Sequence, residues 1–249
     1  MFNEFHYQVR GRGHMRDGTR GQDRTAYLSL RGVQVLCLAD GAGSAAHSEF
    51  GAQAVVTEGC AILAEKFADL VTSVDAEQSR REILERLRAR LEQVAARLDC
   101  SVADLASTFL AVAVSADRFV VIHIGDGVIG YIKHGDLRVV SAPDNDEFAN
   151  QTTFVTSANA SASMRLSRGS LDGVAGFIQM SDGTSARLYD YRAKTLAPAC
   201  AKLVEAVGGM RPTHARNPEQ RKRLRRFVDT QLRRATKDDC SIGILARRT

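Results

Sequence analysis

The chain has 249 residues, of which 44% are hydrophobic, 25% are charged and 6% are aromatic, with no tryptophan and only 4 prolines. This composition is ordinary for a globular protein with a sizeable core, and it excludes a proline-rich linker or a tryptophan-lined carbohydrate platform. No apolar run approaches the length of a membrane span, and the N-terminus MFNEFHYQVRGRGH lacks the apolar core of a secretion signal. The 5 cysteines are odd in number and widely spaced, which argues against a disulfide framework or a zinc site. We therefore expect reduced thiols in a cytoplasmic protein.

The net charge of +5 is unevenly distributed along the chain. Residues 211–237 hold ten Lys/Arg against two acidic residues, whereas the rest of the chain holds 24 Lys/Arg against 27 Asp/Glu. A basic helix of this kind could bind nucleic acid, an acidic membrane or an acidic protein. The alternative is a solvated helix face around a buried stripe formed by Leu224, Phe227, Val228 and Leu232. Because no aromatic interleaving or nucleic-acid motif accompanies the charge, we favour the solvated face, and we expect no membrane partner.

The first half of the chain predicts a hairpin followed by two helices. Residues 26–30 and 33–39 are apolar runs separated by Arg31-Gly32, and the second run ends at Asp40. Residues 48–70 and 75–98 carry apolar residues at helical spacing. We expect these two helices to pack as an antiparallel pair on one side of a sheet.

The second half is rich in strands. Four short apolar runs joined by tight turns predict an antiparallel meander over residues 107–115, 118–124, 128–133 and 137–141. Residues 142–174 are polar and irregular, so we expect loops or a flap there, with room for one short strand. The remaining patterns predict strands over 174–180 and 240–246 and helices over about 193–207 and 217–234. This order predicts an α+β protein with two sheets packed face to face and helices outside.

Aspartates end four apolar strands or turns, and three of them precede glycine. They are Asp40 in LADG, Asp126 in IGDG, Asp182 in MSDG, and Asp238 and Asp239 in KDDCSIG. Each Asp-Gly pair taken alone is best explained as a turn. Carboxylates that converge would repel one another unless cations compensate them, and hard oxygen ligands without His or Cys suit Mg²⁺ or Mn²⁺.

Five short motifs occur in an order that resembles the metal-dependent PP2C-type (PPM) serine/threonine phosphatases. They are GQD at 21–23, LADGAGS at 38–44, HIGDG at 123–127, MSDG at 180–183 and DDCSIG at 238–243. The chain is most similar to the compact bacterial branch, in which a Gly-His…Gly-Gln-Asp opening replaces the usual Arg…Glu-Asp. The segment EFANQTTFVTS at 147–157 also looks like that branch. The resemblance spans about residues 11–246.

This resemblance implies a single domain over residues 1–249 with a four-layer α-β-β-α sandwich, in which two mainly antiparallel sheets are flanked by helix pairs. It also implies a site for two Mn²⁺ or Mg²⁺ ions. Asp40 would bridge both ions and the Gly41 carbonyl would bind one of them, whereas Asp182 and Asp238 would hold the other. Asp23 would hydrogen-bond metal-bound waters. A water bridging the metals would attack the phosphorus directly, without a covalent phosphoenzyme.

The chain departs from the family pattern near its N-terminus. Gln22 stands where the family usually has a metal-binding glutamate, so it would act through a water and with one negative charge fewer. The arginine that commonly grips the substrate phosphate would fall near Gly18, where none stands. We therefore consider His14 or a neighbouring arginine, Arg16, for that role. The alternative is that His14 caps or packs a turn.

Two further departures concern the leaving group and a third metal. Ala42 stands where animal-type members carry a histidine thought to protonate the leaving group, so aryl phosphates would suffer less than alkyl ones. Asp126 matches one ligand of a third metal site, but Ala186 fills the place of the second ligand. We expect His123 to pack beneath the sheet rather than bind a metal.

The leading functional hypothesis is a bacterial, cytoplasmic phosphatase that hydrolyses phosphoserine and phosphothreonine in proteins. Its partners would be phosphorylated proteins, including a Ser/Thr kinase or its targets. A catalytically weak or inactive module that binds phosphoproteins or a kinase is the second hypothesis, because of Gln22, Ala42 and the missing arginine. A nucleic-acid-associated module based on residues 211–237 is the third, and it rests on charge alone.

Overall fold

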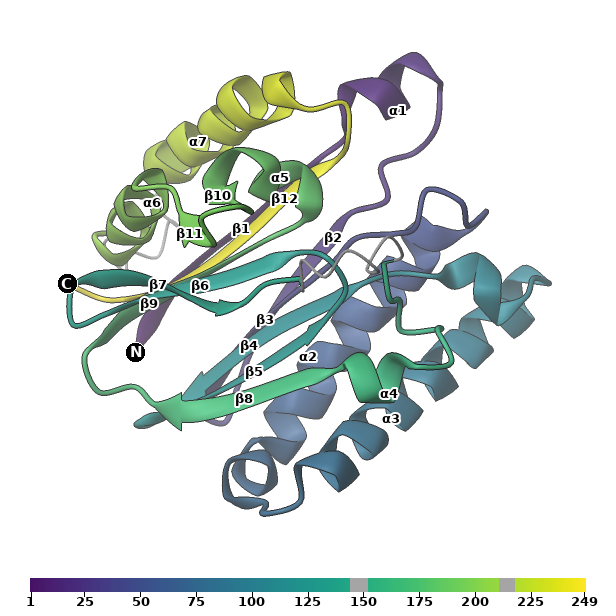
Figure 1. The fold of residues 1–249 in the computed structure, drawn as a ribbon, viewed down its shortest axis with the longest axis horizontal. Coiled ribbons are helices and arrows are strands. Elements are labelled where there is room, and N and C mark those ends of the chain that lie inside the picture. Colours follow the sequence, from purple (N-terminus) through teal and green to yellow (C-terminus); the bar gives the residue numbers. More distant parts are fainter. Residues whose placement is uncertain (144–151, 211–217) are drawn as a thin grey trace. The chain divides into compact units, whose positions relative to one another are not determined.

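The structure, a computed structural model, describes residues 1–143, 152–210 and 218–249 (Figure 1). The chain forms two compact units, and each contains one five-stranded sheet. The first unit comprises residues 1–21, 127–142 and 172–249, and the second comprises residues 22–126 and 143–171. No helix among the described residues is long and apolar enough to cross a membrane. All five cysteines are free thiols.

The second unit is an antiparallel sheet that packs against two long helices. Its strand order is β2-β3-β4-β5-β8. The strands are β2 (Arg24–Leu30), β3 (Val33–Ala39), β4 (Phe109–Ser115), β5 (Arg118–Ile124) and β8 (Arg165–Ser170). Helix α2 (Ser48–Thr72) packs on β2, β3 and β4, and α3 (Ala76–Leu98) packs on α2. The predicted helix pair on one side of a sheet is therefore confirmed.

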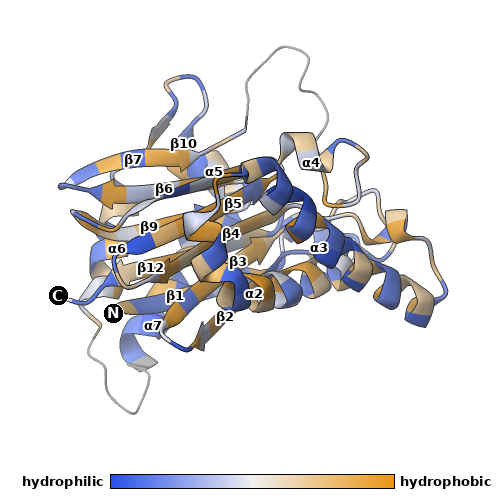
Figure 2. Ribbon diagram, turned by 90° about the horizontal axis from the view of Figure 1, so that it is seen from below, coloured by the Kyte–Doolittle hydropathy of each residue, from blue (hydrophilic) through white to orange (hydrophobic). Residues whose placement is uncertain are grey.

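The helix pair follows from its sequence. Asp75 caps α3, because its side chain accepts a hydrogen bond of 2.8 Å from the backbone N–H of Gln78. The helix ends at Asp99, which adopts a left-handed conformation with φ 52°. Figure 2 shows that α2 is the more hydrophobic helix, as its place between the sheet and α3 requires.

A short 3-10 turn, η1 (Val102–Leu105), closes this core at the start of α2. The two segments approach closely at Gly51, where an added Cβ would lie 1.9 Å from the carbonyl oxygen of Leu105. No side chain fits at that distance, so the position of α2 against η1 depends on glycine.

The first unit is a second antiparallel sheet, with strand order β1-β12-β9-β6-β7. The strands are β1 (Phe2–Val9), β12 (Cys240–Arg247), β9 (Val174–Met180), β6 (Val128–Lys133) and β7 (Asp136–Ser141). Helix α6 (Ala199–Gly208) packs on β12, β9 and β1. The remaining elements are α1 (Arg12–Arg16), α5 (Asp182–Leu188), the hairpin of β10 (Tyr189–Asp190) and β11 (Thr195–Leu196), and α7 (Pro218–Phe227), which continues into η2 (Val228–Leu232) and η3 (Arg233–Ala235).

The basic segment has the predicted buried stripe. Leu224, Val228 and Leu232 are at most 6% exposed and belong to the core of the first unit, and Phe227 packs against it. Arginines on the same helix contact β1. Arg221 donates to the Glu4 carbonyl at 2.8 Å and to the Glu4 carboxylate, and the Arg225 guanidinium lies 5.5 Å from the centre of the Tyr7 ring.

The structure corrects two predictions. Residues 107–141 do not form one meander, because the β4–β5 hairpin belongs to one sheet and the β6–β7 hairpin to the other. The turn at Gly125, whose φ is 116°, separates the two hairpins. The helix expected from about residue 193 begins at Ala199 because β11 precedes it. The region 142–174 contains the one short strand for which the prediction left room, β8, and it pairs with β5. Residues 144–151, including part of the motif at 147–157, lie outside the described residues.

One further difference concerns the N-terminus. β1 was not predicted, since FNEFHYQV alternates poorly, yet it pairs with β12 along its whole length. The hairpin at 26–39, the helices near 48–70 and 75–98, and the strand at 174–180 are confirmed. The α+β class with two mainly antiparallel sheets is confirmed as well.

We expect Gly51→Ala to destabilise the protein. Alanine favours a helix over glycine by up to about 1 kcal/mol. The clash with the Leu105 carbonyl should outweigh this gain and lower the free energy of unfolding by about 2 kcal/mol. Urea denaturation measures the change.

The matched control is Gly43→Ala, because Gly43 is exposed and an added Cβ would find its nearest neighbour, Gln22 Oε1, at 4.0 Å. This variant should stay within about 0.5 kcal/mol of the wild type. A Gly51→Ala protein as stable as the control would contradict the close packing of α2 on η1.

Candidate metal and phosphate site

Asp40 directly follows β3, and hydrogen bonds to the strand alongside fix its backbone. Its N–H donates to the Thr108 hydroxyl at 2.8 Å, and its carbonyl accepts from the Thr108 N–H at 2.8 Å. Gly41 forms an isolated antiparallel bridge with Ser107. The pairing of β3 with β4 thus continues beyond both strands and holds the Asp40 carboxylate at a rigid sheet end.

The small residues after Asp40 have a packing reason. A Cβ at Gly41 would lie 2.8 Å from Cβ and 2.9 Å from Oγ of Ser48, the first residue of α2. Ala42 is 6% exposed, and its N–H donates to the Ala106 carbonyl at 2.9 Å. The chain is therefore confined between η1 and the start of α2 as it leaves β3.

Gln22 and Asp23 lie in the same unit as Asp40. Gln22 is partly exposed, and its Oε1 is the nearest neighbour of a Cβ placed on Gly43. Asp23 is 2% exposed and directly precedes β2, whose first residue, Arg24, donates to the Asp23 carbonyl at 2.7 Å. The structure thus places Asp23 inside the protein, directly before β2.

Asp182 is in the first unit, at the start of α5. It follows β9, and its Oδ1 accepts a hydrogen bond of 2.5 Å from the Gly183 N–H. The turn before it is tied to β12, because the Ser181 N–H donates to the Ser241 carbonyl and the Ser181 hydroxyl accepts from the Ser241 N–H at 3.1 Å. Asp182 is therefore another carboxylate at a fixed strand end.

Gly183 brings Asp182 and Asp238 together. A Cβ at Gly183 would lie 2.1 Å from the Asp239 carbonyl oxygen and 3.2 Å from Cβ of Asp238. Asp238 is exposed, and its Oδ1 accepts from the N–H of Asp239 at 2.8 Å. Two of the predicted metal-binding carboxylates therefore come from adjacent segments of the first unit.

His14 contacts Asp239, a residue to which sequence reasoning gave no role. Asp239 is 2% exposed, and its Oδ1 lies 2.8 Å from His14 Nδ1 and accepts from the Gly11 N–H at 2.6 Å. The His14 side chain is 22% exposed. Asp239 therefore holds the imidazole through Nδ1, and the side chain remains partly exposed.

The Gly-x-Gly-His sequence at 11–14 is explained by its neighbour. A Cβ at Gly11 would lie 2.3 Å from the Asp238 carbonyl carbon and oxygen, and one at Gly13 would lie 2.8 Å from the Lys237 carbonyl oxygen. The Gly13 N–H donates to that oxygen at 2.7 Å. Both glycines thus let α1 lie directly on the backbone that carries Asp238 and Asp239.

Arg16, the second residue considered for phosphate binding, has a different surrounding. Its Nε donates to Asp17 Oδ1 at 2.8 Å, and its side chain is 72% exposed. The hydrogen bond from Arg16 lowers the pKa of the Asp17 carboxyl, although both groups lie at the surface. Between the two residues considered, His14 is the one anchored next to a predicted metal ligand.

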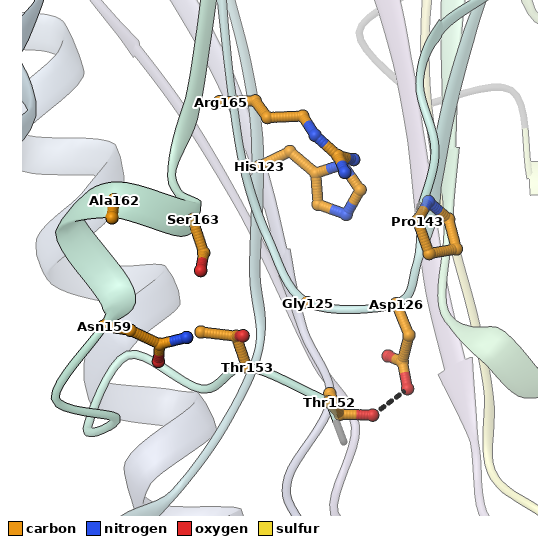
Figure 3. A pocket seen from close by; sticks show the side chains of 10 residues that line it. All are labelled: His123, Gly125, Asp126, Pro143, Thr152, Thr153, Asn159, Ala162, Ser163 and Arg165. Atoms are coloured by element: carbon orange, nitrogen blue, oxygen red, sulfur yellow. Dashed lines mark hydrogen bonds between the residues drawn. The ribbon is translucent and has the colours of Figure 1, made fainter. Parts of the chain in front are cut away.

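Asp126 lines a cavity of about 370 Å³ in the second unit (Figure 3). Its Oδ2 accepts from the Thr152 hydroxyl at 2.6 Å. His123, which is 1% exposed, lines the same cavity. His123 is therefore buried as predicted, and its ring faces a polar space.

The chemistry of the predicted donors fits hard divalent cations. Among the described residues, no group of three or more His, Cys, Asp or Glu side chains is gathered so that it could hold a metal ion. The candidates are divided between the units, with Asp40 and Gly41 in the second and Asp182 and Asp238 in the first. All of them offer carboxylate or carbonyl oxygen, which Mg²⁺ and Mn²⁺ prefer. The close packing at Gly183 brings the backbone segments of two of these residues, Asp182 and Asp238, together.

Comparison with known proteins identifies the family. The family model described as protein phosphatase 2C matches residues 10–229, and the chain belongs to this family. The match runs through both units. The predicted recognition and enzyme class, a PP2C-type protein phosphatase, are confirmed at the level of the family.

Individual relatives agree with this assignment. The chain is 33% identical over 124 residues to serine/threonine-protein phosphatase 3 of Escherichia coli (strain K12), and the match covers 49% of this chain and 48% of that protein. The chain thus spans about half the length of the curated relative it matches. A bacterial serine phosphatase superimposes with a TM-score of 0.66 at 16% identity over 99% of this chain and 98% of its own. The S. agalactiae serine/threonine phosphatase gives 0.62 at 15% identity over 100% of both chains, and these structures show that the fold is shared.

We expect Asp239→Ala to destabilise the first unit and to release His14. The variant leaves the buried Gly11 N–H without its acceptor and removes the partner of the imidazole. The free energy of unfolding should fall by about 2–3 kcal/mol. Urea denaturation measures this loss, and the NMR line width of the His14 ring reports its mobility.

Asp17→Ala is the control, because Asp17 pairs with Arg16 at the surface. Its effect should be below about 0.5 kcal/mol. If the two variants were equally stable, Asp239 would not be the anchor described above.

Proposed function

We propose that the protein is a metal-dependent phosphatase that hydrolyses phosphoserine and phosphothreonine in proteins. Family membership supports the reaction class. The observation that carries the proposal for this chain is the packing of Gly183 on residues 238 and 239, which brings the Asp182 and Asp238 segments together. Carboxylates that converge from such adjacent segments would repel one another unless cations compensate them.

Asp40, the Gly41 carbonyl, Asp182 and Asp238 would hold two Mn²⁺ or Mg²⁺ ions, with Gln22 and Asp23 contacting them through water. When bound, the ions would activate water for direct attack on phosphorus and offset charge on the phosphoryl oxygens. The chain itself contributes fixed positions: Asp40 is held by two backbone hydrogen bonds to Thr108. Asp126 is a weaker candidate, because the Thr152 hydroxyl already binds its carboxylate.

His14 would bind the substrate phosphate. Asp239 Oδ1 lies 2.8 Å from Nδ1 and would accept a hydrogen bond from it, and in the imidazolium form of the ring Nε2 would also donate, to a phosphoryl oxygen. This would supply the contact that an arginine commonly makes in the family. Phosphorylated proteins of a bacterial cytoplasm, including a Ser/Thr kinase or its targets, would be the substrates.

A second candidate is a weak or inactive module that binds phosphoproteins or a kinase. Gln22 in place of a glutamate favours it, because one negative charge that would attract the second cation is missing. Ala42 favours it too, since no acid stands there to protonate a leaving alkoxide. The first candidate predicts hydrolysis of phosphate esters, and the second predicts binding with little or no hydrolysis.

Hydrolysis of an aryl phosphate tests the proposal. We expect activity that requires Mn²⁺ or Mg²⁺, disappears with EDTA and falls about 100-fold or more in Asp40→Asn or Asp182→Asn. Asp136→Asn is the control, because Asp136 pairs with Arg138 at the surface of the β6–β7 hairpin. No turnover with any divalent metal, together with retained phosphopeptide binding, would instead identify a binding module.

Substitution of His14 tests its role separately. We expect His14→Ala to raise KM for phosphopeptides about tenfold with a smaller effect on kcat, because one charge-assisted hydrogen bond is lost. Titration of His14→Ala with Mn²⁺ should give the same Mn²⁺ affinity as titration of the wild type. Arg16→Ala is the control, since Arg16 pairs with Asp17, and its KM should not change. Unaltered kinetics in His14→Ala would remove the proposed phosphate contact.

A further inference from the structure

The cavity of the second unit is lined mostly by groups that donate hydrogen bonds. It lies between the end of β5, the Gly125–Asp126 turn, α4 (Ala160–Ser163) and the start of β8. Its polar lining comprises Arg165, His123, Asn159, Ser163, Thr152 and Thr153, together with one carboxylate, Asp126. The proposed reaction assigns no role to any of these residues except Asp126.

Arg165, a cationic residue of the described lining, lies beside His123 at one end of the cavity. They are directly opposite each other in the antiparallel pairing of β5 with β8, so their side chains lie on the same face of the sheet. Figure 3 shows the Arg165 guanidinium beside the His123 ring, both facing the cavity. The next pair, Ile122 and Leu166, points to the opposite face, where Ile122 joins the core formed with α2 and α3.

Among the described residues of the lining, Asp126 is the one carboxylate. Asp126 is at the other end of the view in Figure 3, and its Oδ2 accepts from the Thr152 hydroxyl at 2.6 Å. Arg165 presents a planar guanidinium, which matches carboxylate and phosphate oxygens. The hydroxyls and amide of Ser163, Thr153 and Asn159 can complete the hydrogen bonding of an anion.

The cavity is close to Asp40 within the same sheet. A Cβ at Gly125 would lie 2.5 Å from Cγ2 of Thr108, and the Thr108 hydroxyl accepts from the Asp40 N–H. Asp40, Thr108 and Gly125 thus end three neighbouring strands, and two strand spacings separate Asp40 from the cavity by roughly 10 Å. An extended peptide covers that distance in about three residues.

We propose that this cavity is a specificity subsite that binds an anionic side chain of the substrate, two or three residues from the phosphorylated serine or threonine. The anion would be a carboxylate or a second phosphate, held by Arg165. This rests on the proposed function, because it places the reacting phosphate at Asp40. It names the substrate class: phosphoproteins with acidic or multiply phosphorylated sites.

Matched phosphopeptides test the subsite. Each carries one phosphoserine in a neutral context, with Glu or Gln at a single position up to four residues to either side. The wild type should hydrolyse one Glu peptide, substituted two or three residues away, about tenfold faster in kcat/KM than its Gln partner. A peptide with a second phosphoserine at that position distinguishes phosphate from carboxylate, and the better of the two identifies the source of the anion.

Three variants locate the effect. Arg165→Gln should bring the Glu/Gln ratio close to one, mainly through KM. Arg168→Gln removes the same charge from the same strand, but Arg168 donates to the Ser73 carbonyl outside the cavity, so the ratio should remain. Ala162→Glu places a carboxylate at an exposed rim position and should lower the ratio without disturbing the core.

The outcomes separate this subsite from the proposed function. Hydrolysis of the aryl phosphate with a Glu/Gln ratio of one at every position would overturn the subsite and leave the phosphatase intact. A Glu/Gln ratio that stays near the wild-type value in Arg165→Gln would also overturn the subsite. If the aryl phosphate is not hydrolysed at all, the proposed function fails. Fluorescence anisotropy then measures the binding of the same peptides. Tighter binding of the Glu peptide than of the Gln peptide, lost in Arg165→Gln, would support the subsite. Equal binding of the two peptides would overturn it.

Discussion

Close backbone packing around residues 237–239 positions half of the candidate site. Glycines from two other segments approach this backbone: a Cβ would lie 2.3 Å from its atoms at Gly11, 2.8 Å at Gly13 and 2.1 Å at Gly183. Because these distances are shorter than any real Cβ contact, a larger residue would push the segments apart. The packing gathers the Asp182 and Asp238 segments with the residues around His14. The buried carboxylate of Asp239 then fixes the loop that carries His14, through the Gly11 N–H and the imidazole.

The second unit positions its carboxylate by hydrogen bonding instead. Asp40 lies where β3 has ended, yet its backbone still pairs with Thr108, and Gly41 still pairs with Ser107. The side chain of Ser48 closes the space beside Gly41. In both units an Asp-Gly pair combines a candidate metal-binding carboxylate with a glycine that allows a close neighbour. The glycines of LADG and MSDG are therefore steric requirements of the fold, whatever the metal content of the site.

Sequence patterns predicted the elements better than their arrangement. Helical periodicity over residues 48–98 and alternation in short runs are local signals, so the helices and most strands were found. Sheet membership is a long-range property: nothing in residues 128–141 reveals that β6 pairs with β9 rather than β5. β1 was missed because its run alternates poorly, and its pairing partner is more than two hundred residues away, so no local signal indicates it. The candidate carboxylates came from motifs, but the role of Asp239 depends on a contact with His14 that only the folded chain makes.

The departures at Gln22 and His14 change the charge of the site in a consistent way. A glutamine in place of a glutamate removes one negative charge, which weakens attraction for cations and also weakens repulsion of a phosphate dianion. A histidine, unlike an arginine, is not a permanent cation. The imidazole of His14 is, however, held by the buried carboxylate of Asp239. A site with fewer fixed negative charges needs less fixed positive charge to bind phosphate. Under the proposed roles of Gln22 and His14, the loss of a glutamate and the loss of an arginine would offset each other in the charge of the site, whereas either exchange alone would shift the balance between metal and substrate binding.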